Sequence, residues 1–124
     1  NAFEMDTILT SHGHDNPASY GTYPRILGYY VRELGLLSLE NAIHKFTGLG
    51  AQRMRLGRRG LIRAGYAADI TIFNPETVAG PADFIDANLA PIGIEHVIIN
   101  GVSVVRDGRY LGNDRAGQFL TRAA

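Results

Sequence analysis

Apolar positions along this chain change their spacing near its middle. Between residues 26 and 46 they recur at intervals of three and four, which predicts helices. From residue 69 onward they alternate with polar residues or form short runs rich in Val and Ile, which predicts strands. We therefore expect a mainly helical first part and a strand-rich second part.

The first helix is predicted from Thr22 to Gly35. Thr22 is a residue type that caps helices, and Pro24 suits a first turn because its missing N–H needs no partner there. Gly35 is expected to end the helix. The segment before it, Thr10 to Tyr20, is rich in Ser, Gly, Asp, Asn and Pro, and we expect a loop there.

A second helix is predicted from Ser38 to Gly48, with Ser38 as its cap and Glu40 in its first turn. Gly48 and Gly50 are expected to end it. Four arginines then fall between residues 53 and 59. A solvated helix end explains them most simply, and phosphate binding is the alternative.

The strongest strand signal behind these helices is a hairpin. Asn100-Gly101 separates Ile94–Ile99 from Val102–Val105, and both turn residues tolerate the positive φ of a type I′ turn. Asp107-Gly108 predicts a second turn. Asp69 to Phe73 predicts a strand that is mostly buried, because both of its faces are largely apolar.

Two further segments complete the expected fold. Phe3 to Leu9 predicts a short strand close to the first residue of the sequence. The stretch from Pro75 to Ala90 shows no periodicity, and we expect Phe84 and Ile85 to anchor it to the core.

Composition excludes several classes of protein. Hydrophobic residues make up 45% of the 124 positions and charged residues 19%, which is typical of a globular chain. The net charge is zero and no long basic run stands out, which argues against nucleic-acid binding. No apolar run approaches the length of a membrane span. The chain has no cysteine, which fits a cytoplasmic protein.

Candidate chemistry gathers around the first loop. His12 and His14 have the spacing that places two rings on one face of an extended segment, and Asp15 follows them. These residues form either a metal site or a simple polar loop. Arg25 either binds a substrate carboxylate or makes a salt bridge beside its helix. We expect Asp69 to be structural rather than catalytic.

Four stretches of sequence together resemble a known family. They are GTYPR at 21–25, GLLSLENAIHKFTGL at 35–49, RGLIRAGYAADITIFNPETV at 59–78 and GIEHVIINGVSVVRDGRYL at 93–111. The chain is similar to the C-terminal part of the amidohydrolase superfamily, in its N-acyl-D-amino-acid deacylase (D-aminoacylase) branch. The resemblance covers nearly the whole chain.

The resemblance implies an α/β fold. Residues 1–58 would supply the last strand and helices of a (β/α)8 barrel. Residues 59–111 would supply the C-terminal strands of a small β-sandwich, and residues 112–124 would form a tail. The resemblance also implies a zinc enzyme, with its catalytic groups at the carboxyl ends of the barrel strands.

In such enzymes a carboxylate at the end of the eighth strand acts as the general base. His12 stands at the position of that carboxylate, and Asp15 is the alternative. The resemblance leaves His12 and His14 as the candidate metal ligands and Arg25 as the candidate substrate ligand.

A chain of this length cannot close a barrel. We expect it to be a segment of a hydrolase that acts on N-acyl-D-amino acids, inactive in isolation and completed by the remainder of the barrel. The alternative is a non-catalytic α/β module, derived from such an enzyme, that associates with itself.

Overall fold

A computed structural model describes residues 16–112 and 115–121 of the chain. These residues divide into two compact units. The helix unit takes its described residues from 16–42 and 74–93, and the sheet unit takes its own from 43–73 and from 94 onward. The predicted strand from Phe3 to Leu9 lies outside the described residues.

Helix α1 (Pro17–Arg25) begins earlier than the sequence pattern predicted. Its cap is Asn16, whose side chain accepts a hydrogen bond of 3.0 Å from the N–H of Ala18, and Pro17 occupies the first turn. The predicted cap, Thr22, lies inside the helix, where its hydroxyl donates to the carbonyl of Ala18 at 2.7 Å. The prediction of a loop reaching Tyr20 was therefore wrong, although Asn-Pro is itself a helix-start signal.

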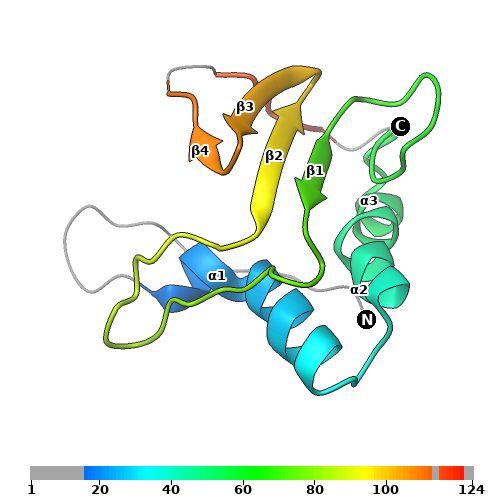
Figure 1. Cartoon of the computed structure of the whole chain (residues 1–124). Coiled ribbons are helices and arrows are strands. Elements are labelled where there is room, and N and C mark those ends of the chain that lie inside the picture. Colours follow the sequence, from blue (N-terminus) through cyan, green and yellow to red (C-terminus); the bar gives the residue numbers. More distant parts are fainter. Residues whose placement is uncertain (1–15, 113–114, 122–124) are drawn as a thin grey trace. The chain divides into compact units, whose positions relative to one another are not determined.

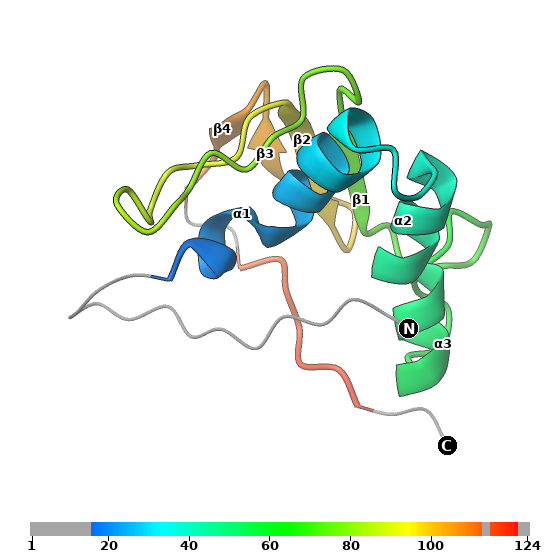
Figure 2. The same cartoon turned by 90° about the horizontal axis from the view of Figure 1, so that it is seen from below.

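A π-helix, η1 (Ile26–Glu33), follows α1 without a break (Figure 2). Pro24 lies within α1. A proline ring inside a helix clashes with the carbonyl four residues earlier, and its nitrogen has no hydrogen to donate. The π-helix, in which each N–H bonds the carbonyl five residues earlier, begins two residues after Pro24. At its end, the N–H of Leu34 donates to the carbonyl of Tyr29 at 2.9 Å. Gly35, with a φ of 60°, ends the helical run as predicted.

Helix α2 (Leu39–Phe46) has the predicted cap, since Ser38 Oγ accepts a hydrogen bond of 3.2 Å from the N–H of Asn41. The boundary between the two units falls within this helix. Helix α3 (Gly48–Met54) begins almost at once. Gly50 therefore lies inside a helix and does not end one, which corrects the prediction.

The sheet unit contains four antiparallel strands in the order β1-β2-β3-β4 (Figure 1). Their bounds are Ile70–Phe73, Ile94–Ile99, Val102–Arg106 and Arg109–Tyr110. Asn100 and Gly101 have φ values of 49° and 82°, and Asp107 and Gly108 have values of 50° and 72°. Both predicted turns are thus confirmed, with the positive φ that these residue types favour.

Strand β1 is less buried than its apolar composition predicted. Within the described sheet it pairs only with β2, so it lies at an edge. Ile72 is 44% exposed as a result. The expectation of a strand covered on both faces was wrong for this reason.

The connection from residue 74 to residue 93 is anchored by small residues, not by the two large ones predicted. Phe84 and Ile85 are 93% and 90% exposed. Val78 is instead fully buried, and Ala82 is nearly so. Gly28 allows this packing, because a Cβ atom there would lie 2.5 Å from the carbonyl oxygen of Val78.

Arg32 fixes the same connection to η1. Its Nη1 donates to the carbonyl of Val78 at 2.8 Å and to that of Pro75 at 3.1 Å. A short bridge between Ala79 and Ile92 then closes the two ends of the connection on each other. The segment is thus well held despite having no regular secondary structure of its own. None of the described helices has the length and apolarity needed to span a bilayer.

Candidate functional site

An open cleft of about 430 Å³ lies in the helix unit. One wall comes from α1 and the start of η1, and the other from the residues that follow Gly80. Its lining is mainly apolar, with one cationic and one anionic side chain, Arg25 and Asp83. The remaining lining residues include Pro17, Ala18, Ile26, Tyr30, Ala82 and Phe84. Such a surface suits an apolar group that carries a charge.

Arg25 is the last residue of α1, and it lines this cleft as an exposed side chain. Its guanidinium carbon lies 5.7 Å from the centre of the Tyr29 ring, within the range of a cation–π contact. The two residues are four positions apart, which places them on one face of the helical run. The structure thus orients Arg25 towards an aromatic neighbour and leaves its charge accessible.

Asp83 supplies the negative charge of the cleft. Its pKa lies below the ordinary value, because the carboxylate accepts hydrogen bonds of 2.8 Å from the N–H groups of Asp86 and Ile85. The positive charge of Arg25 adds a smaller lowering of this pKa. Asp83 is therefore ionised at neutral pH. The sequence reading missed this residue, although Asp is a residue type that closes turns by bonding its own backbone.

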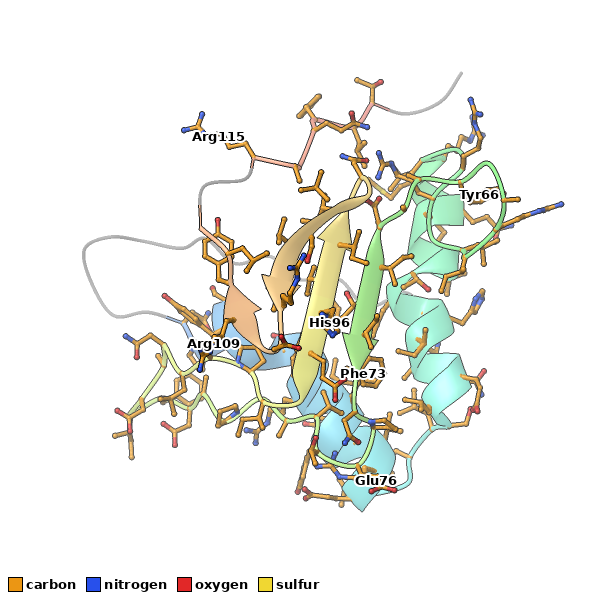
Figure 3. The ribbon with its side chains drawn as sticks, turned by 45° about the horizontal axis from the view of Figure 1, so that its top comes forward. Tyr66, Phe73, Glu76, His96, Arg109 and Arg115 are labelled. Atoms are coloured by element: carbon orange, nitrogen blue, oxygen red, sulfur yellow. The ribbon has the colours of Figure 1, made fainter. Side chains whose placement is uncertain are left out.

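The candidate metal ligands cannot be placed in the same way. His12, His14 and Asp15 lie outside the described residues. Within 16–112 and 115–121, no three His, Asp or Glu side chains come together as metal ligands would. Figure 3 shows His96 on β2. Its Nε2 lies 3.9 Å from Oδ1 of Asp107, which is in the turn between β3 and β4.

A polar cluster in the sheet unit explains Asp69. Its carboxylate pairs with the guanidinium of Arg59 and accepts a 2.8 Å hydrogen bond from the N–H of Asn100. Arg59 Nη2 also donates to the Asn100 side-chain oxygen at 3.0 Å. Asn100 then donates to the carbonyl of Ala116 at 2.7 Å. Asp69 is thus structural, as predicted, and Arg59 is committed to this cluster rather than to a phosphate.

Comparison with known proteins identifies the family. The sequence profile of the amidohydrolase family matches residues 5–105, which is most of the chain. This chain belongs to the amidohydrolase family. Among its relatives in that family, D-aminoacylase from Alcaligenes xylosoxydans xylosoxydans is 43% identical over 123 residues. N-acyl-D-aspartate deacylase from the same organism is 45% identical over 107 residues.

Solved structures of amidohydrolases agree with this placement. A crystal structure of D-aminoacylase superposes with a TM-score of 0.83 at 43% identity and covers 86% of this chain. N-acyl-D-glutamate deacylase from Bordetella bronchiseptica, in complex with zinc and a phosphonate inhibitor, superposes with a TM-score of 0.71 at 38% identity and covers 77% of this chain. The predicted resemblance to the deacylase branch is confirmed.

The match is limited to a part of each relative. The chain covers 95% of its own length against D-aminoacylase but only 25% of that protein, and 21% of the aspartate deacylase. It therefore spans about a quarter of the relatives it matches. D-aminoacylase itself is described with a binuclear metal centre.

Proposed function

We propose that this chain is a segment of a metal-dependent hydrolase that cleaves the amide bond of N-acyl-D-amino acids. The observation that carries this proposal is the 43% identity to D-aminoacylase across 123 residues. The TM-score of 0.83 against the solved enzyme supports it.

The proposal includes the division of the chain into three parts. Residues 1–58 form the last strand and helices of a (β/α)8 barrel, residues 59–111 form part of a β-sandwich, and residues 112–124 form a tail. In support, every described helix lies before residue 55 and every described strand lies after residue 69. An order of helices followed by strands is expected where the end of a barrel precedes part of a sandwich.

The described residues do not themselves make a metal site, since they contain no group of three suitable ligands. Zinc would therefore depend on residues outside them, among which His12 and His14 are the candidates in this chain. His12 stands where the family carries its catalytic carboxylate. As an alternative to binding zinc, the His12 imidazole would accept a proton from the attacking water in that position. Asp15 is the alternative base.

Arg25 is the proposed ligand of the substrate carboxylate. Its exposed guanidinium lines the cleft, beside apolar walls that suit an apolar side chain. A guanidinium recognises a carboxylate through two parallel hydrogen bonds, which fixes the orientation of the substrate. A salt bridge beside the helix is the alternative role for Arg25.

Expression of the chain alone, and of the chain with the reading frame upstream of Asn1, tests the hydrolase proposal. Both preparations are incubated with zinc and with the N-acetyl derivatives of D-methionine, D-aspartate and D-glutamate, or with those of the L enantiomers, and the release of free amine is measured. We expect no activity from the chain alone and cleavage of D but not L substrates by the longer protein. An upstream frame without metal-binding histidines, together with an inactive longer protein, contradicts the proposal.

A second candidate is a non-catalytic module that associates with itself. Two observations favour it: the apolar side chains of Phe84 and Ile85 are almost fully exposed, and β1 lies at the edge of the described sheet. For either candidate we propose a cytoplasmic location, since the chain has no cysteine.

A further inference from the structure

The hairpin turn at Asn100-Gly101 contains a chemically reactive dipeptide. An asparagine side chain can be attacked by the backbone nitrogen of the next residue, and glycine hinders that attack least because it has no side chain. Both residues are exposed to solvent. Their positive φ values of 49° and 82° are the reason that this pair suits the turn. The residues that form the hairpin therefore also form a site at which the chain can modify itself.

The modification is deamidation, and it needs only water. The Gly101 nitrogen gives up its proton to hydroxide and attacks Cγ of Asn100. A bond from this nitrogen to Cγ forms, the bond from Cγ to Nδ2 breaks, and ammonia leaves with a proton taken from water. Water then adds to either carbonyl of the succinimide ring, which opens to aspartate or to isoaspartate. Ring closure rotates the Cα–C bond of Asn100 away from its value in a type I′ turn, so the turn must open first.

The folded chain restrains both reacting groups. The N–H of Gly101 donates to the carbonyl of Ala68 at 2.9 Å, and rotation of the Asn100 Cα–C bond would break this hydrogen bond. In the Asn100 side chain, Oδ1 accepts from Nη2 of Arg59 at 3.0 Å, and Nδ2 donates to the carbonyl of Ala116 at 2.7 Å. Both polar atoms of the reacting amide are thus held in place.

Asp69 connects these restraints. Its carboxylate accepts a 2.8 Å hydrogen bond from the N–H of Asn100 and pairs with the guanidinium of Arg59. All three residues belong to the sheet unit. Arg59 also has an opposing effect, because a cation on the amide oxygen stabilises the charge that develops there during attack. The nitrogen reaches Cγ only after the turn has opened, however, so the restraint sets the rate.

We propose that Asn100 is a latent deamidation site that the pair of Arg59 and Asp69 protects. The side chain reacts only in molecules whose turn is locally open, so the population of that open state determines the rate. The inference is independent of the hydrolase function proposed above.

The product of deamidation no longer fits the cluster. Its carboxylate has no N–H to donate to the carbonyl of Ala116, so two oxygen atoms face each other where a hydrogen bond was. It also brings a second negative charge close to Asp69. Modification therefore removes a contact that ties residues 115–121 to the hairpin.

Deamidation rates of the 124-residue chain test this inference. The chain, its variants and a synthetic peptide with the sequence of residues 96–104 are kept in mildly alkaline buffer, and mass spectrometry measures the aspartate and isoaspartate formed at position 100. We expect the chain to react at least about tenfold more slowly than the peptide, because only its open state is reactive. Asp69→Ala should raise the rate of the chain by at least about fivefold, since the N–H of Asn100 loses its acceptor.

A conservative variant keeps the test valid if circular dichroism shows that Asp69→Ala disturbs folding. Arg59→Lys retains the positive charge but removes the planar group that reaches both Asp69 and Asn100, so it should also raise the rate. Arg58→Lys is the matched control and should leave the rate unchanged. Arg58 is the exposed neighbour of Arg59, and within residues 16–112 and 115–121 its side chain makes no hydrogen bond or ion pair with the turn.

Two outcomes overturn the inference. One is a parent chain that deamidates as fast as the peptide. The other is an Arg59→Lys rate equal to or below that of the parent chain, because Arg59 would then not protect Asn100. Asn100→Asp makes the product directly and should speed hydrogen exchange in residues 115–121. Unchanged exchange there would contradict the predicted loss of contact.

Discussion

The packing of the buried connection on η1 can be tested by adding one methyl group at Gly28. In the variant Gly28→Ala, the new Cβ would lie 2.5 Å from the carbonyl oxygen of Val78 and 3.3 Å from the Cα of Ala79. The first distance is shorter than any real carbon–oxygen contact, and both neighbouring atoms belong to the backbone. The connection must therefore move away from the helix, because no side chain can rotate to make room.

The cost follows from what this movement disturbs. Overpacking of a tight contact costs about 1–3 kcal/mol. The displaced carbonyl of Val78 also accepts the 2.8 Å hydrogen bond from Arg32, and a bond to a charged group contributes roughly 1.5–3 kcal/mol. Alanine favours a helix over glycine by about 1 kcal/mol, which offsets part of the loss. These terms together predict a net destabilisation of roughly 1.5–5 kcal/mol.

Gly50→Ala is the matched control, since it makes the same chemical change within helix α3. A Cβ atom at Gly50 meets nothing within 4 Å. Only the helix preference then acts, so this variant should be up to about 1 kcal/mol more stable than the parent chain.

Urea unfolding followed by circular dichroism gives the free energies of the two variants. Hydrogen exchange of the peptide spanning residues 74–93 shows whether the loss is local, as the structure requires. We expect faster exchange there in Gly28→Ala and unchanged exchange in Gly50→Ala. A Gly28→Ala chain as stable as the parent, with its 74–93 segment equally protected, would refute the proposed contact.

Three further predictions concern single side chains. Asp69→Ala should destabilise the chain by about 1–3 kcal/mol, because Arg59 and the N–H of Asn100 lose their shared acceptor, and amide exchange at the 100–101 turn should quicken. The pKa of Asp83 in the folded chain lies below its ordinary value of 3.8, so this carboxylate stabilises the fold fully above pH 3.8 and loses that contribution as the pH falls through the lower folded pKa. Acid titration of the free energy of unfolding should lack this loss in Asp83→Asn. Identical titrations of the variant and the parent chain would contradict the hydrogen bonds given as the cause. Zinc added to the chain in a calorimeter should release heat that His12→Ala reduces if His12 and His14 are ligands; equal heats from both proteins would exclude His12.

Some contacts in the candidate site are set by neighbouring residues in the sequence, and others by the packing of distant segments. The proximity of Arg25 and Tyr29 follows from their spacing of four residues along a helical run, so the sequence predicts it. The sequence does not predict that Asp83 lines the same cleft, because its position depends on how the 74–93 connection packs against α1 and η1. The roles of His12, His14 and Asp15 come from family resemblance, and they stay predictions.

Sequence alone determined the features that a few neighbouring residues decide. The predictions of a turn at Asn100-Gly101 and of a cap at Ser38 are confirmed. Both depend on local properties, which are the tolerance of Asn and Gly for positive φ and the side-chain oxygen of Ser. Only the tertiary structure decided what is buried. Val78 is buried because Gly28, fifty positions earlier in the sequence, lacks a side chain and lets the Val78 backbone lie close to η1. The larger Phe84 stays exposed. Burial of an apolar side chain lowers the free energy of the chain, and the sequence shows which side chains are apolar. Which segments pack together to bury them is decided by the whole fold.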